Sequence, residues 1–158
     1  MTAISTDELA RRAAILRRFR ELLLTQRDRF QNYLTALDKQ QSIIKAGNAE
    51  ELLAHVELEE QIVADIFSIQ KVIDPLEAMY HSVKPGLSSD DDVPTLKTTL
   101  ENLKNEAAAR FAHNKELLCA RMAQIRAEIT SLRNNPFAAM ARPLYENTVS
   151  ASLVDLSG

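Results

Sequence analysis

Apolar side chains recur every seven residues along the first third of the chain. The repeat comprises Leu9, Leu16, Leu23, Phe30, Leu37 and Ile44. Seven residues make nearly two turns of an α-helix, so these side chains line one side of a continuous helix. No proline or glycine interrupts the stretch, and strong helix formers are common in it. The spacing predicts a helix over about residues 5–46, roughly 60 Å long at about 1.5 Å per residue.

The width of this apolar stripe indicates a helical bundle rather than an isolated coiled coil. Three residues after the seam positions stand polar side chains such as Arg12, Gln26 and Gln40, which do not suit a tight two-stranded coiled coil. On the other side of the seam, apolar residues widen the stripe: Ile15, Leu22, Ala36 and Ile43. A broad stripe suits packing against more than one neighbouring helix.

A second helix is predicted to run back along the first. Gly47 can take the left-handed conformation that ends a helix, and Asn48 can cap the next one. A link this short makes the two helices antiparallel. The predicted second helix, about residues 48–81, carries a coiled-coil seam: Ile62, Ile66, Ile69, Ile73, Leu76 and Tyr80.

Two features interrupt the regularity of the second helix. Its first turns put Leu52, His55 and Glu59 in the seam register, so we expect these turns to be less well buried. Pro75 removes a backbone hydrogen bond and disfavours helical geometry at Asp74. Because the apolar seam continues in phase beyond the proline, we expect a kink there, or a restart capped by Asp74.

A loop at residues 82–94 separates the second helix from a third, predicted over about residues 95–133. Its seam is Leu96, Leu100, Leu103, Ala107, Phe111, Leu118, Met122, Ile125, Ile129 and Leu132. The first half of this helix can pack on the hairpin, and the second half has an amphipathic face. We therefore expect an all-α fold, an elongated antiparallel hairpin or bundle of three long helices, in a domain of residues 1–133.

Residues 134–158 form an apolar tail with few charges and no clean helical or strand period. Asn134, Asn135 and Pro136 are expected to stop the third helix. Disordered tails are normally poor in large apolar residues, so this one is expected to dock. Two interpretations stay open: the tail folds back on its own bundle, or it binds a partner.

The sequence lacks the residue patterns of an enzyme or a metal protein. Only three glycines are present, which is too few for a phosphate-binding loop. His55 lies four residues from Glu59, which we interpret as a surface pair, and neither a di-iron nor a His-Glu-x-x-His motif occurs. The aspartates at 90–92 lack the spacing of a calcium loop and are expected before the N-terminus of the third helix. We expect no catalytic residue, no metal and no cofactor, and we interpret the single Cys119 as an inert, buried or half-exposed thiol.

Charge is unevenly distributed along a chain whose net charge is −3. Residues 1–46 carry nine Lys+Arg and five Asp+Glu (+4), residues 47–94 carry two and eleven (−9), and residues 95–158 carry eight and six (+2). This pattern favours contact between the acidic middle helix and its basic neighbours, and solvated charged faces explain it equally well. The arginines between Arg11 and Arg20 surround their helix rather than forming a stripe, so nucleic-acid binding is not expected.

Hydropathy gives an expectation for the location of the protein. No apolar run approaches the ~18 residues that a membrane span needs, and no signal-peptide hydrophobic region stands at the start of the sequence. We therefore expect no membrane insertion and a cytoplasmic location.

The turn and its flanking segments carry a family resemblance. Residues 45–53, Lys-Ala-Gly-Asn-Ala-Glu-Glu-Leu-Leu, combine a Gly-Asn turn with a helix that opens on Glu-x-Leu. Residues 26–37 precede this turn, and residues 55–62 and 70–77 complete the second helix. In these stretches the chain resembles the FlgN-type flagellar type III export chaperones, whose members have a leucine-rich first helix and a Gly-Asp/Asn turn. The tail, residues 135–156, also looks like the closing segment of such chaperones.

The resemblance implies a non-enzymatic cytoplasmic chaperone that binds flagellar hook-associated (hook–filament junction) proteins. Such a chaperone keeps the association helices of its clients from aggregating and delivers them to the export gate, so export-gate or export-ATPase components are implied as further partners. In that family the C-terminal amphipathic region binds the client. Onto this chain the region maps to Leu118, Met122, Ile125, Ile129, Leu132, Phe137, Leu144 and Tyr145. The chain departs from the family at residues 59–61, Glu-Glu-Gln, where many members have a lysine-containing segment.

The amphipathic face also suits partner binding on physical grounds. Helix-in-groove recognition uses apolar anchors at i, i+3 or i+4, and i+7, and a methionine such as Met122 adapts to varied partners. An alternative interpretation is a structural coiled-coil adaptor that self-assembles through the seam of its first helix. The sequence leaves open whether the free protein is a monomer or a homodimer.

Overall fold

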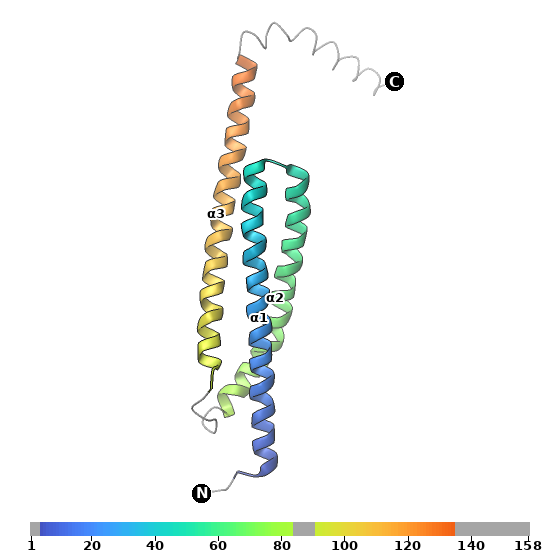
Figure 1. Ribbon diagram of the computed structural model, residues 1–158, viewed down its shortest axis with the longest axis vertical. Coiled ribbons are helices and arrows are strands. Elements are labelled where there is room, and N and C mark those ends of the chain that lie inside the picture. The colour runs from blue at the N-terminus through green and yellow to red at the C-terminus, as the bar shows by residue number, and fades with distance from the viewer. Residues whose placement is uncertain (1–3, 84–90, 135–158) are drawn as a thin grey trace, which may run out of the picture. The chain divides into compact units, whose positions relative to one another are not determined.

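A computed structural model describes residues 4–83 and 91–134 of the chain. These residues form three long helices and no strand: α1 (Thr6–Ala46), α2 (Ala49–Val83) and α3 (Val93–Asn134), which are labelled in Figure 1. The predicted all-α fold class is confirmed. Each predicted helix boundary lies within two residues of the observed one.

The predicted turn between the first two helices is confirmed in atomic detail. Gly47 has a φ of 75°, in the left-handed region, and its N–H donates to the carbonyl oxygens of Ile43 and Ile44. The side chain of Asn48 then caps α2 by accepting a hydrogen bond of 3.1 Å from the backbone N–H of Glu51. The short link makes α1 and α2 an antiparallel hairpin, as Figure 1 shows.

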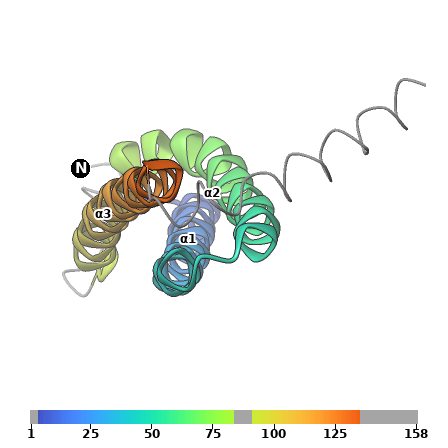
Figure 2. The ribbon, with the colours of Figure 1, turned by 90° about the horizontal axis from the view of Figure 1, so that it is seen from above.

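Pro75 lies inside a continuous α2, so the helix does not restart there. The ribbon of α2 curves around α1, and its C-terminal end reaches the side of α1 on which α3 begins (Figures 1 and 2). A proline inside a helix removes one backbone i→i−4 hydrogen bond and tends to bend the helix axis. Of the two expected outcomes at this position, the restart is therefore not observed, and the ribbon of α2 as a whole is curved.

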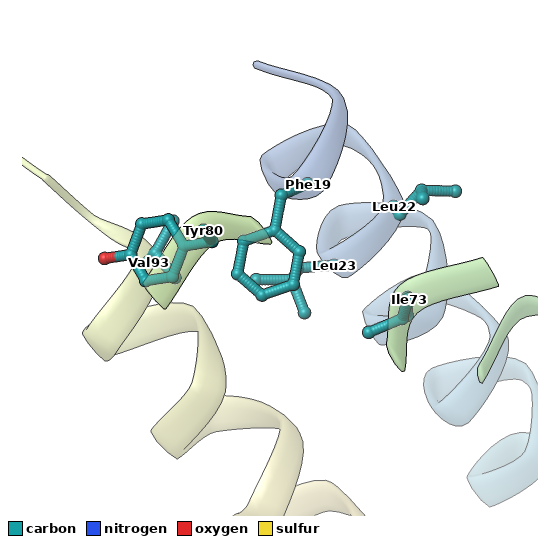
Figure 3. Close-up of a cluster of buried hydrophobic side chains, with 6 residues drawn as sticks. All are labelled: Phe19, Leu22, Leu23, Ile73, Tyr80 and Val93. Atoms are coloured by element: carbon teal, nitrogen blue, oxygen red, sulfur yellow. The ribbon is translucent and has the colours of Figure 1, made fainter. Parts of the chain in front are cut away.

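A cluster of apolar side chains joins the three helices at the loop end of the hairpin, where α2 ends and α3 begins (Figure 3). The buried members are Phe19, Leu22, Leu23, Ile73, Tyr80 and Val93. The rings of Phe19 and Tyr80 lie 5.0 Å apart, a favourable aromatic contact. The Tyr80 hydroxyl donates to Asp91, and burial together with this carboxylate raises the pKa of Tyr80 to about 12.

A second cluster lies further along α1, where Leu34 and Leu37 pack against Ala107 of α3. The first half of α3 therefore packs on the hairpin, as the sequence suggested it can. The apolar seam of α1 is not buried from its start, however, because Leu9 is 50% exposed and the core begins at Ile15.

Contacts divide the chain into two compact units, Met1–Leu117 and Leu118–Gly158. The first unit contains the hairpin and the first part of α3. In the second unit, the structure describes only the later turns of α3, Leu118–Asn134.

Candidate partner-binding surfaces

The predicted partner-binding residues of the second unit lie on one face of α3, which we call the apolar stripe. Its members are Leu118, Met122, Ile125, Ile129 and Leu132, which follow one another at steps of four, three, four and three residues. Leu118 is half-buried, whereas the other four side chains are between 43% and 61% exposed. Exposure of four large apolar side chains on one helix face indicates a surface that a partner can cover.

Other sequence predictions for this region have mixed outcomes. Phe137, Leu144 and Tyr145 lie outside the described residues. Cys119 is an exposed free thiol, so the prediction that it is buried or half-exposed is wrong. The polar side chains beside the stripe bond locally: Arg121 donates to Gln124 at 3.1 Å, and that amide donates to Glu128 at 3.3 Å.

The first unit contains a cavity of about 550 Å³ that the sequence did not reveal. We call it the three-helix groove, because residues of α1, α2 and α3 all line it, and we call the α1 lining its floor and the α2 and α3 linings its walls. The groove is partly open to solvent. Aromatic and aliphatic side chains dominate the lining, as is usual for ligand pockets of this size. The floor consists of Phe19, Leu23, Gln26, Phe30 and Tyr33.

The walls of the groove differ in character. The α2 wall is apolar around Val63, Ile66 and Phe67, and Phe67 is 64% exposed. The α3 wall presents Leu100 between charged side chains. The sequence does contain a signal for the α2 wall. Val63 and Phe67 directly follow the seam residues Ile62 and Ile66, so they form a second apolar row beside the seam. The seam alone does not reveal this second row.

The three-helix groove lies between α3 and the hairpin within the first unit. At one end of the groove, Lys97 of α3 pairs with Glu77 of α2. Long side chains therefore join α3 to α2 at this end of the groove.

A buried polar network bridges the three helices beyond the other end of the groove. Asn114 of α3 donates to the Leu37 carbonyl at 2.8 Å and to the Gln40 side-chain oxygen at 3.0 Å, both on α1. Gln40 in turn donates to the Glu59 carboxylate of α2 at 2.9 Å. His55 Nε2 donates to the carbonyl of Ala36 at 2.6 Å, and the same nitrogen lies 3.3 Å from Glu59 Oε1.

This network corrects two sequence predictions. His55 and Glu59 were interpreted as a surface pair at a poorly buried end of the second helix, but each is only 6% exposed. Gln40, which does not suit a tight two-stranded coiled coil, is buried in this three-helix arrangement as well. The physical reason is that each polar side chain finds a partner inside the bundle, which removes most of the cost of burying it.

Burial changes the acidity of groups at this network. The pKa of Glu59 is raised above its ordinary value, mainly by burial, while the nearby His55 and the hydrogen bond from Gln40 act in the opposite direction. The pKa of Tyr33 is raised by burial and by the negative charge of Glu59. Gln26, in the groove floor, donates to the Ile66 carbonyl and to the Gln70 side-chain oxygen, and its own side-chain oxygen has no donor among the described residues.

The loop aspartates behave as predicted where they are described. Asp91 accepts from the backbone N–H of Val93 at 3.0 Å, and Asp92 pairs with Arg20 of α1 at 2.8 Å, so both lie at the start of α3. Within residues 4–83 and 91–134, no group of three or more His, Cys, Asp or Glu side chains is arranged to hold a metal ion. None of the helices in these ranges is both long enough and apolar enough to cross a bilayer.

Comparison with known proteins places the chain in a family without assigning a function. No protein-family model matches the chain. No solved structure matches it either. A protein of Treponema pallidum (strain Nichols), described as uncharacterized, is 34% identical over 155 residues, which cover 98% of this chain and 96% of the relative. Identity at this level over nearly the full length of both chains shows that this chain belongs to the same family as the Treponema pallidum protein.

Proposed function

We propose that this protein is a non-enzymatic secretion chaperone that binds amphipathic helices of flagellar hook-associated proteins. The observation that carries the proposal is the apolar stripe, with Met122, Ile125, Ile129 and Leu132 exposed on one face of α3. The resemblance of the turn and its flanking helices to FlgN-type export chaperones supplies the client class. Delivery to export-gate or export-ATPase components in the cytoplasm is part of the same proposal.

The stripe has the chemistry that such a client needs. A helix that assembles with other helices exposes an apolar face, and covering that face prevents premature association. The stripe offers aliphatic anchors at helical spacing, and Met122 can adapt its three side-chain torsions to different clients. Because the three arginines between Arg121 and Arg133 outnumber the single Glu128, the stripe also favours an acidic client helix.

The alternative function, an adaptor that self-assembles through the seam of its first helix, is less well supported. From Leu23 to Ile44 that seam is largely occupied within one chain, with Leu23, Leu37 and Ile44 each at most 3% exposed. Self-assembly through those side chains would require the hairpin to open. Light scattering tests the adaptor, because an oligomer that assembles through the first-helix seam should form without any client and should weaken when Leu9, an exposed member of the seam, is replaced by Asp.

Co-purification with candidate hook-associated subunits tests the chaperone. We expect the full chain to capture a subunit, and the double substitution Ile125→Asp with Ile129→Asp to abolish capture while helicity by circular dichroism stays largely unchanged. The matched control places the same two charges at Ala120 and Ala127, exposed positions on the opposite side of the helix. Equal capture by both double variants would rule out the stripe as the client site.

A chain ending at Arg133 separates the stripe from the tail. Capture by the full chain but not by the shortened one would place the site in the tail. Equal capture would keep it on the stripe. If neither chain captures any hook-associated subunit, the chaperone proposal itself fails.

A further inference from the structure

The three-helix groove and the apolar stripe match each other in length. Along α1 the groove runs from Phe19 to Tyr33, and along α2 from Val63 to Glu77, in each case over 14 residue steps. The stripe runs from Leu118 to Leu132, also 14 steps. At about 1.5 Å per residue, both surfaces are about 21 Å long.

The two surfaces also match in chemistry. The α2 wall of the groove is apolar where Phe67 projects into solvent, so a second apolar helix face can be buried there. An isolated apolar stripe of several side chains and an unfilled apolar groove each expose surface whose burial stabilises an assembly by about 25 cal/mol per Å² before the costs of association. The groove can therefore bury the apolar side chains of the stripe, and the stripe can cover the apolar lining of the groove.

Charge favours the same pairing. Helix α2 carries eight Asp+Glu against the single Lys71, a net charge of −7 with histidines neutral. The segment Leu118–Asn134 carries three arginines against the single Glu128, a net charge of +2. Among the charged side chains that line the groove, the Lys97–Glu77 pair leaves Asp74 and Glu101 against Lys104, a net charge of −1. A basic amphipathic helix is therefore attracted to this groove, and the attraction weakens as salt is added.

We propose that two copies of the chain associate reciprocally, with the apolar stripe of each copy lying in the three-helix groove of the other. Each copy has one groove and one stripe, so a twofold arrangement buries both surfaces of both copies and closes at two chains. The partner is identified by these three matches of length, apolar character and charge. A second copy meets all of them.

This association bears on the proposed function without resting on it. The stripe that holds the partner copy is the same stripe that we propose for client helices, so a client must displace the second copy. The dimer is thus a resting state in which the stripe is covered. Measurements without any client test the dimer alone, and its failure leaves the chaperone proposal standing.

Sedimentation equilibrium of the full chain tests the association. We expect a species of twice the 17.7 kDa chain mass whose dissociation constant rises with salt. Phe67→Glu in the groove and Ile125→Asp on the stripe should each weaken the dimer by at least about tenfold, because each puts an unpaired charge into an apolar contact. Leu58→Glu is the matched control, since Leu58 is 52% exposed on α2 but does not line the groove; the dimer should persist.

Mixing the two variants distinguishes this reciprocal contact from other dimers. Phe67→Glu leaves the stripe intact, and Ile125→Asp leaves the groove intact, so the mixture should form a heterodimer through one remaining contact. Each variant alone has no intact contact, so the mixture should associate more tightly than either variant alone. Circular dichroism verifies that both variants fold. A monomeric parent chain overturns the proposal. A dimer that Ile125→Asp breaks but Phe67→Glu does not also overturns it, because the stripes then pair with each other.

Discussion

The two ends of the three-helix unit differ in the polar interactions that join their helices. At the loop end, Phe19, Tyr80 and Val93 form an apolar cluster in which each side chain is at most 2% exposed. At the turn end, Gln40, Glu59 and Asn114 form a buried polar chain that runs from α3 through α1 to α2. The three-helix groove extends from the apolar cluster toward the polar chain and shares Phe19 with the cluster.

This difference indicates that stability and helix alignment depend on different ends of the bundle. Apolar burial supplies most of the stability but is tolerant of small shifts between helices, because it is not directional. Hydrogen bonds between buried groups are directional, and a helix that slides by one residue leaves them unmade at a cost. We therefore expect the loop end to dominate stability and the turn end to define how α3 is aligned on the hairpin.

The largest effect is expected from Phe19→Ala. Phe19 is fully buried and stacks on Tyr80, so its removal leaves a cavity among three helices and should lower the free energy of unfolding by about 3–5 kcal/mol. Urea unfolding followed by circular dichroism measures the change. The same substitution at Phe111, which is 51% exposed, is the control and should cost far less. Equal losses at both positions would contradict a stability-dominating loop end.

A smaller effect is expected from Asn114→Ala at the polar end. The substitution removes two hydrogen bonds and leaves Gln40 without a donor inside the bundle, which should cost about 2 kcal/mol. Asn102→Ala is the matched control, because Asn102 is exposed on the same helix. Hydrogen exchange should report faster opening of α3 around residue 114 in the first variant. Unchanged exchange there would mean that the network does not align α3.

Glu59→Gln should change how the free energy of unfolding depends on pH more than it changes the magnitude of that free energy. Because burial raises the pKa of Glu59 in the folded state, the fold favours its protonated form. The contribution of Glu59 is thus fully present below its unfolded pKa and is lost as pH rises through the raised value. Glutamine keeps an oxygen for the bond from Gln40 and does not titrate.

The measurement compares the free energies of unfolding of the parent chain and Glu59→Gln from acidic to neutral pH. As pH rises through this window, the parent should lose stability relative to the variant. Glu60→Gln, an exposed neighbour, serves as the control and should leave the pH profile of the parent unchanged. A constant difference between the parent and Glu59→Gln would show that Glu59 has the same pKa in both states.

The contrast between the two ends also explains what the sequence could predict. Periodicity located all three helices, and Gly47 and Asn48 located the turn, because these features depend on local backbone chemistry. The polar network could not be predicted from local sequence. A glutamine or histidine at a seam position gives the same sequence pattern whether its side chain bonds water or a side chain far along the chain. Asn114 lies 74 residues from Gln40, and only tertiary packing brings them together.

The candidate surfaces divide in the same way. The apolar stripe follows from helical spacing alone, so the sequence predicted Met122, Ile125, Ile129 and Leu132 on one face, and the structure adds that they are exposed. The three-helix groove depends on how side chains of three helices pack together. No spacing within one segment encodes that packing.

The smallest effect on stability is expected from Phe67→Ala in the α2 wall of the groove. Because Phe67 is 64% exposed, its truncation should change the free energy of unfolding by less than about 1 kcal/mol, against the several kcal/mol expected at Phe19. Urea unfolding at a protein concentration where the chain is monomeric gives the intrinsic value. A loss comparable to that of Phe19→Ala would mean that the groove is closed over Phe67 and belongs to the core. A negligible loss in the monomer, combined with a clear loss at concentrations where two chains associate, would instead place this side chain in a contact between copies.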